Sequence, residues 1–191
     1  MKYARVERER RWLLGRMPSA ATDLLPTRIV DCYLDGMRMR LREMSRPDGT
    51  VVRKLGHKVR LGSGPREVAC TSLYLSDEEW ERLSALPGRR LVKDRYAVRL
   101  GDLVFAVDAL HGDHEGLVLA ELDGGESLPD PAPELLEALG VVREVTDDEA
   151  FTGAALAAAP GQSLPSDSCG NPPSGHCWSS HELPSGSSNR L

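Results

Sequence analysis

Several segments of the chain alternate between polar and apolar side chains. Over 37–42 the alternation is strict, so that Arg38, Arg40 and Arg42 share one face. A period of two is typical of a strand, because successive side chains leave opposite faces of a sheet. Related patterns, with charges gathered on one face, occur over 51–59, 91–99, 104–110 and 117–123. The pattern therefore predicts a protein built largely of strands.

The charges on these faces differ in sign from one strand to the next. Glu7 and Glu9 share a face near the start of the chain, together with Arg11. Glu121 and Asp123 form a second acidic pair near the end of the strand region. Between the two acidic pairs, the strand faces carry bases: the three arginines of 38–42, Lys54, Lys58, Lys93 and Arg95.

Charged faces on several strands are explained if they line the inside of a closed barrel, which can enclose a polar cavity. Two carboxylates two positions apart suit a hard divalent cation, which takes oxygen ligands. Arginine matches phosphate oxygens with its planar fork. The alternative is a set of independent, solvent-exposed charged faces. It does not explain why the acids fall on the first and last strands, so we predict an interior site for a polyanion and a metal.

Helix signals are few. Ser76 begins a capping box ahead of an amphipathic segment, and 133–139 reads as a short helix that stops at Gly140. Thr146 begins a second capping-box pattern, which predicts a helix through about Ala158.

These motifs, in this order, resemble the CYTH domain family of triphosphate tunnel metalloenzymes. That family includes inorganic triphosphatases, thiamine triphosphatases and some adenylate cyclases. Its E-x-E-x-K motif reads here with Arg11 in place of lysine, and its acidic E-x-E strand ends here in Asp123. The other matching motifs are the arginine strand, Lys93-Asp94-Arg95-Tyr96, Val107-Asp108 and the closing segment 143–146. The resemblance covers roughly residues 3–157.

The resemblance implies an α+β fold, a closed antiparallel β-barrel forming a tunnel with a few peripheral helices. We expect this domain over 1–158. The Ser/Pro/Gly-rich segment 159–191 has few apolar residues, so we expect a disordered tail there.

The function expected is metal-dependent hydrolysis of a triphosphate, by in-line attack of water on the terminal phosphoryl group. Mg²⁺ or Mn²⁺ would be held by a set of carboxylates: Glu7, Glu9, Glu121, Asp123 and Asp108. The triphosphate would be bound by a set of bases: Arg11, Arg38, Arg40, Arg42, Lys54, Lys58, Lys93 and Arg95. Lys93 with Tyr33 is the candidate for activating the water, because neighbouring cations lower the pKa of a lysine.

Inorganic tripolyphosphate is the favoured substrate, because only 5% of the residues are aromatic and few side chains could stack on a base. Adenylate cyclase, thiamine triphosphatase and a non-catalytic binder of polyphosphate or nucleotides remain alternatives. The net charge of −5 argues against general nucleic-acid binding. No apolar run approaches about 18 residues, and the first residues are charged, so we expect a cytoplasmic protein that does not enter a membrane. The sequence leaves the oligomeric state open.

Overall fold

A computed structural model describes residues 4–62, 67–125 and 128–159. Nine strands form one antiparallel sheet in this part of the chain. They are β1 (Arg5–Leu14), β2 (Thr27–Leu34), β3 (Met39–Ser45), β4 (Val51–Arg60), β5 (Glu67–Tyr74), β6 (Gly88–Leu100), β7 (Leu103–Leu110), β8 (Val118–Asp123) and β9 (Val141–Glu144). The predicted tail, 159–191, lies outside the described residues apart from its first position.

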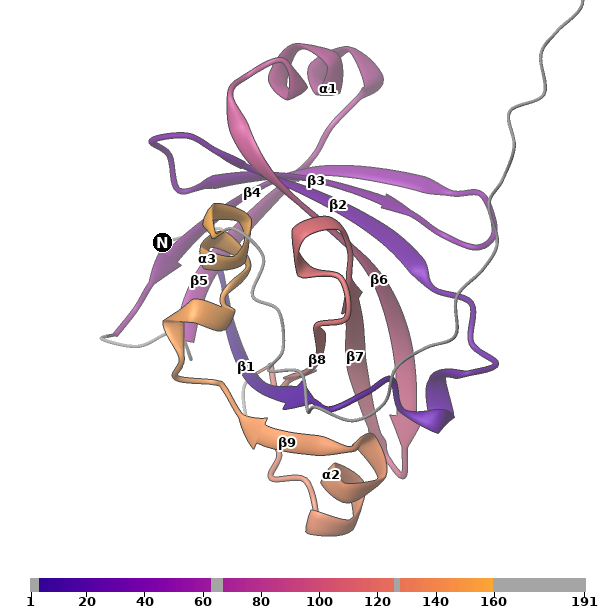
Figure 1. The fold of residues 1–191 in the computed structure, drawn as a ribbon. Coiled ribbons are helices and arrows are strands. Elements are labelled where there is room, and N and C mark those ends of the chain that lie inside the picture. The colour runs from indigo at the N-terminus through magenta and orange to yellow at the C-terminus, as the bar shows by residue number, and fades with distance from the viewer. Residues whose placement is uncertain (1–3, 63–66, 126–127, 160–191) are drawn as a thin grey trace, which may run out of the picture.

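The sheet closes into a barrel because β1 pairs with two different strands. Its first half, 5–8, pairs with β5, and its second half, 9–14, pairs with β8. The order β5-β4-β3-β2-β6-β7-β8-β1 therefore returns to β5 as a barrel of eight strands. β9 adds to the end of β1 outside this ring (Figure 1). The predicted closed antiparallel barrel is confirmed.

Three α-helices occur in the described residues: α1 (Asp77–Ser84), α2 (Pro133–Leu139) and α3 (Gly153–Ala158). The capping box of α1 is confirmed, since the Ser76 hydroxyl accepts from the Glu79 amide and the Glu79 carboxylate accepts from the Ser76 amide. α2 ends as predicted at Gly140, whose φ of 71° is left-handed. None of the described helices is long and apolar enough to cross a membrane.

The helix predicted from Thr146 begins later than expected. The Thr146 side chain is buried, and its hydroxyl accepts from the Arg11 amide at 3.0 Å and donates to Glu144 at 2.6 Å. It is therefore engaged with β1 and β9 and does not cap a helix. A 3₁₀ turn, η3 (Glu149–Phe151), comes first, and α3 then begins with Thr152 as its cap.

The main apolar core lies outside the barrel ring, under α2 and β9. It contains Trp12, Leu14, Val107, Ala120, Leu122 and Leu139. On β1, β7 and β8 these residues alternate with the charged ones, which point to the other side of the sheet. Packing on the outer face thus fixes which side chains turn inward.

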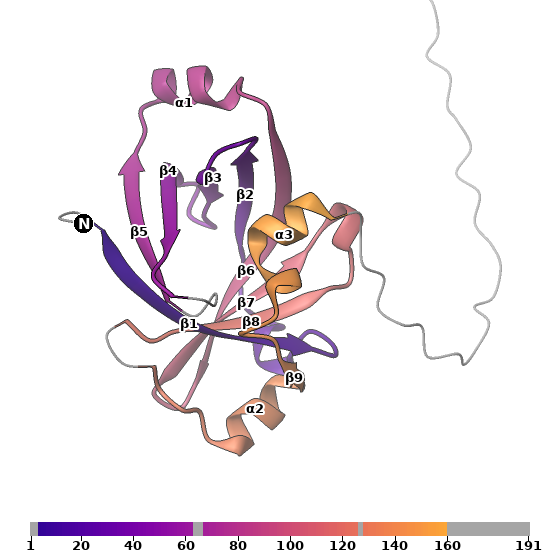
Figure 2. The same cartoon turned by 90° about the vertical axis from the view of Figure 1, so that its left-hand side faces the viewer.

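A second apolar cluster closes one end of the barrel. Leu13, Leu91, Leu110 and Leu119 have the same strand parity as the charged inward residues, but they lie nearer one end of the barrel. They pack with Val145, Phe151 and Leu156 from the segment that leads through η3 into α3. Figures 1 and 2 show α3 lying over this end of the barrel. The barrel interior is therefore polar along part of its length and filled by apolar side chains at one end.

Candidate functional site: the barrel interior

The barrel encloses a cavity of about 810 Å³. Twelve of the fourteen residues predicted for the site line it: Glu7, Glu9, Arg11, Tyr33, Arg38, Arg40, Arg42, Lys58, Lys93, Arg95, Glu121 and Asp123. They come from seven different elements, and closure of the barrel brings them together. Arg38 differs from expectation in its local structure, because β3 begins at Met39 and Arg38 lies in the turn after Gly36, where it is exposed.

Lys54 and Asp108 are the two predicted residues that do not line the cavity. The ammonium of Lys54, near the start of β4, lies 4.8 Å from the centre of the Tyr74 ring. Asp108 is 1% exposed, and its oxygens accept from Arg95 at 2.6 Å and from Lys93. Asp108 therefore lies behind the bases that face the cavity.

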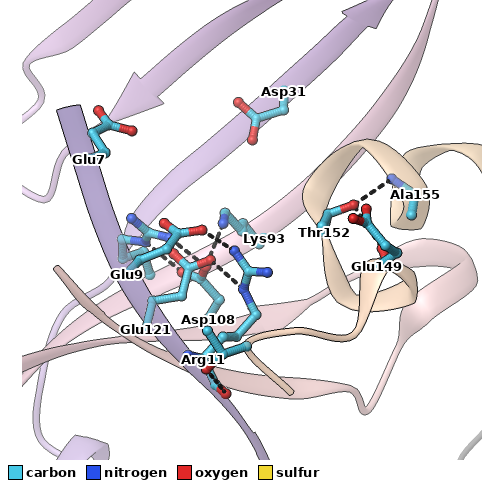
Figure 3. Close-up of polar contacts among 12 residues, drawn as sticks. Glu7, Glu9, Arg11, Asp31, Lys93, Asp108, Glu121, Glu149, Thr152 and Ala155 are labelled. Carbon is cyan, nitrogen blue, oxygen red and sulfur yellow. Dashed lines mark hydrogen bonds and ion pairs between the residues drawn. The ribbon is translucent and has the colours of Figure 1, made fainter. Parts of the chain in front are cut away.

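Glu9, Arg11 and Glu121 form the centre of the acidic wall. Arg11 is 6% exposed and reaches both acids: its Nη2 donates to Glu9, and its Nε donates to Glu121 at 3.1 Å. Arg95 donates to the other Glu121 oxygen at 2.5 Å. Figure 3 shows Glu9 and Glu121 close together near Lys93, with Glu7 nearer the start of β1. The register places Glu9 directly opposite Asp123, so the two acidic pairs meet as predicted.

The outer acids are held more loosely. Glu7 of β1 lies 2.9 Å from the ammonium of Lys58 on β4, the two strands that flank β5, and both side chains are about one-third exposed. Asp123 is mostly exposed and lies 3.8 Å from Arg5. The wall thus grades from partly buried acids paired with Arg11 to an acid that is mostly solvated.

The acids do not share one electrostatic environment. Burial raises the pKa of Glu9, and the Glu121 carboxylate raises it further, which together outweigh Arg11 and Lys58. Burial also acts to raise the pKa of Glu121, but Lys93, Arg95 and Arg11 hold it well below its ordinary value. Glu9 is therefore the acid that gains most from an additional cation.

A divalent metal fits this wall in donor chemistry. Carboxylate oxygens are the ligands that hard cations take, and a cation would relieve the repulsion that raises the pKa of Glu9. In the arrangement described, no three His, Cys, Asp or Glu side chains of residues 4–62, 67–125 and 128–159 converge closely enough to hold a metal ion. Arg11 and Lys58 take the carboxylate oxygens instead.

The two residues predicted to activate water have opposite shifts. Burial lowers the pKa of Lys93; Asp108 opposes this, and Arg95 and Arg42 add to it. Burial raises the pKa of Tyr33, as does nearby Asp31, so its phenol stays protonated at neutral pH. Of the two, only Lys93 is shifted toward accepting a proton.

The fold has known counterparts. Two solved structures of NE1496, described as an inorganic triphosphatase and as a hypothetical protein, match with TM-scores of 0.50 and 0.51 at 24% identity. These matches cover 82% and 81% of this chain and 97% and 99% of those chains. The barrel fold of this chain is therefore similar to that of NE1496. A conserved hypothetical protein from Pyrococcus furiosus matches with a TM-score of 0.44 at 17% identity, over 70% of this chain and 90% of that chain. No protein-family model and no curated protein sequence matches the chain.

Asp31 is a buried acid beside the cavity that the sequence analysis missed. It is 0% exposed and accepts from Arg42 Nε at 2.6 Å and Nη2 at 2.7 Å. It lies two positions before Tyr33 on β2 and therefore shares its face. This shared face could have indicated that Asp31 points inward. A single acid in a mostly apolar strand, however, does not form a recognisable motif.

Asp31 makes stability depend on pH. Burial acts to raise its pKa, but Arg42 and Arg40 outweigh this and hold it below the ordinary value. A carboxylate whose pKa is lower in the folded state stabilises the fold above its unfolded pKa of about 4, and this stabilisation is lost as pH falls through the folded pKa. We expect Asp31→Asn to unfold at a lower urea concentration than wild type at pH 7, and the difference between their urea midpoints to narrow below about pH 4. A difference in midpoint that stays constant from pH 7 to 3 would contradict a lowered pKa for Asp31.

Tyr33 and α3 meet inside the tunnel at Gly153. A Cβ at Gly153 would lie 2.1 Å from the Tyr33 hydroxyl and 3.1 Å from its Cζ. Thr152, Gly153 and Ala154 also line the cavity. The sequence analysis missed this contact, and it explains why the first residue of α3 carries no side chain.

Gly153→Ala should therefore lower Tm, even though alanine favours helix more than glycine does. The added methyl forces α3 or Tyr33 to shift, at a cost of about 1–3 kcal/mol. Tyr33→Phe should recover part of the loss, because it removes the closest clashing atom. Gly62→Ala is the matched control, since nothing lies within 4 Å of its Cβ position and its φ is not positive. Equal Tm changes in the two alanine variants would rule out the proposed clash.

Proposed function

We propose that this protein hydrolyses a triphosphate inside the tunnel, with inorganic tripolyphosphate as its substrate. The observation that carries the proposal is the basic wall of the cavity. Arg38, Arg40, Lys58, Lys93 and Arg95 face one enclosed space from neighbouring strands and the β2–β3 turn. So many bases in one enclosure suit a compact polyanion, because each cation otherwise repels the next. The likeness of the fold to the inorganic triphosphatase NE1496 supports the same conclusion.

The metal belongs on the opposite wall in this proposal. Glu7, Glu9 and Glu121 would hold Mg²⁺ or Mn²⁺, with Asp123 at the edge of the set. When bound, the metal supplies positive charge that neutralises phosphate oxygens during transfer. For these acids to be available, Arg11 must release Glu9 and Lys58 must release Glu7. Both bases then become available to the phosphate groups.

The chain's own residues contribute mainly positioning and charge. The bases orient the triphosphate, and the buried cations stabilise negative charge as it develops on the transferred phosphoryl group. Lys93, with its lowered pKa, is the group we assign to take the proton of the attacking water. The Tyr33 phenol, which stays protonated, is assigned to donate a hydrogen bond in the tunnel.

A triphosphate with an organic group is the second candidate, because part of the tunnel wall is apolar. Ala97, Val104 and Ala106 line the cavity at one place, and Met37 and Met39 line it at another. Apolar side chains gain nothing from contact with tripolyphosphate, but they can pack against a nucleotide base or a thiazole ring. Adenylate cyclase and thiamine triphosphatase activities therefore remain in this candidate class.

The test is a substrate panel. The protein is incubated with tripolyphosphate, ATP or thiamine triphosphate in the presence of Mg²⁺, Mn²⁺ or EDTA, and phosphate and cyclic AMP are measured. We expect metal-dependent phosphate release that is fastest with tripolyphosphate. Faster turnover of an organic triphosphate would favour the second candidate. Tight binding without turnover of any of the three would contradict the proposed hydrolysis.

A further inference from the structure

Asp31 lies where neither a substrate nor a metal ion can reach it. Its exposed fraction is 0%, and both oxygens accept from Arg42, at 2.6 and 2.7 Å. The Nε of Arg40 lies 3.4 Å from the same carboxylate. Any effect of Asp31 on a bound triphosphate must therefore pass through these two arginines.

The strand register explains why one acid serves two arginines. Asp31 of β2 is opposite Arg42 of β3, and Tyr33 is opposite Arg40, with all four side chains on the inward face. Two arginines at adjacent inward positions repel each other, and Asp31 supplies the opposite charge between them. The arginine pair is therefore held in place before any phosphate arrives.

The contacts leave the cavity side of each arginine available. Asp31 uses the Nε and Nη2 atoms of Arg42, so Nη1 remains for another acceptor. The Nε of Arg40 is buried and has no hydrogen-bond partner among the described residues. The nearby charge of Asp31 therefore orients the Nε side of the Arg40 guanidinium. The Nη2 of Arg40 lies beside Gly56, which lines the cavity. Both arginines line the cavity and keep nitrogens that Asp31 does not use.

We propose that Asp31 is a positioning residue that holds Arg42 and Arg40 in the orientation in which they meet the triphosphate. This inference rests on the proposed function, because it concerns how the same tunnel binds its substrate. Preoriented donors stabilise transition-state charge without having to reorganise during the reaction. The Asp31 carboxylate also repels an anionic ligand, and this repulsion offsets the gain in binding from the oriented arginines. We therefore expect Asp31 to affect turnover more than binding.

The kinetic test is a double-mutant cycle on Asp31 and Arg42. Asp31→Asn should lower kcat for tripolyphosphate by about tenfold or more, as expected for misplaced charged groups, while KM changes by less than about threefold. In an Arg42→Gln background, the same change should lower kcat by less than about threefold. Asp94→Asn is the matched control, because Asp94 also pairs with an arginine, Arg28 at 2.8 Å, but does not line the cavity. It should keep the wild-type kcat.

Two kinetic results would overturn the proposal. One is an Asp31→Asn variant that has a lower Tm but the wild-type kcat, which would make the residue purely structural. The other is a loss of kcat that is as large in the Arg42→Gln background as in wild type. Both variants are compared by circular dichroism first, so that only folded protein enters the assay.

A second measurement does not need turnover and separates this inference from the proposed function. The Arg42 Nε–H signal is followed by ¹⁵N NMR during titration with tripolyphosphate, with and without Mg²⁺. In wild type and Asp94→Asn the signal should be sharp and should shift with tripolyphosphate; in Asp31→Asn it should be broadened throughout. A wild-type Arg42 signal that tripolyphosphate does not move would overturn the inference. Absent hydrolysis with a shifting signal would overturn only the proposed function.

Discussion

Glu9→Gln should lower kcat for tripolyphosphate hydrolysis by about 100-fold or more, which is the size of effect seen when a charged group is removed from an active site. Glu9 lies at the centre of the acidic wall, paired with Arg11 and close enough to Glu121 for the two carboxylates to repel. Glutamine keeps the shape of the side chain but removes the charge that a metal requires. Activity is measured across a range of Mn²⁺ concentrations, and we expect the loss to persist at saturation.

The fold should survive this change. Arg11 retains its bond to Glu121, and removing Glu9 also removes a carboxylate whose burial is unfavourable. We therefore expect Tm to change by no more than about 3 °C. Glu144→Gln is the matched control: Glu144 binds Arg10 on the outer side of β1 at 2.7 and 3.1 Å, and its loss should leave kcat unchanged. Full activity in Glu9→Gln would remove Glu9 from the metal set.

Local sequence patterns predicted the strands well, because strand alternation is a local property. The charged residues of 51–59, 91–99 and 104–110 fall within β4, β6 and β7. The closure of the barrel has no such local signal. Closure depends on β1, which pairs with β5 up to Arg8 and with β8 from Glu9 onward. These pairings are set by the packing of all eight barrel strands. The closed barrel was therefore predicted only indirectly, from the charged faces on several strands and from the resemblance to a known family.

Thr146, Lys54 and Asp108 make contacts that their local patterns did not predict, because the partner of each side chain lies far away in the sequence. Thr146 has the sequence context of a helix cap, but the Arg11 amide captures its hydroxyl. Lys54 has the parity of the inward bases, yet it lies against Tyr74 of β5. Asp108 fits a list of metal ligands by residue type, although Lys93 and Arg95 take both of its oxygens. In each case tertiary contacts decide which of several possible roles a residue has.

The tunnel has two kinds of positive charge, and they are held differently. Arg42 and Arg95 are anchored by buried aspartates, Asp31 and Asp108, at 2.6–2.7 Å. Lys58 forms its ion pair with the partly exposed Glu7, and Arg38 is exposed. Anchored cations favour a fixed geometry, whereas loosely held ones can follow an entering ligand. The arrangement therefore suits a substrate that is steered in by the outer bases and aligned by the inner ones.

Arg40 lies between these two groups, and Arg40→Ala should show the second-largest effect. Its guanidinium lines the cavity, and its Nε has no hydrogen-bond partner among the described residues, only the Asp31 ion pair at 3.4 Å. Losing a charged hydrogen bond to phosphate should weaken tripolyphosphate binding by about 1.5–3 kcal/mol, or roughly 10- to 150-fold in Kd. Calorimetric titration with tripolyphosphate measures this directly.

Without ligand, Arg40→Ala should have a Tm within about 4 °C of wild type, because removing one of several like charges offsets the lost packing. Arg53→Ala provides the contrast. Arg53 also lies in the β3–β4 region, but it binds Glu43 at 2.7 Å, contacts Asp77 and stacks on Trp80, away from the cavity. It should lower Tm without changing tripolyphosphate affinity. If instead Arg40→Ala lost stability and kept its affinity, the arginine face would be structural and the tunnel would not be a triphosphate site.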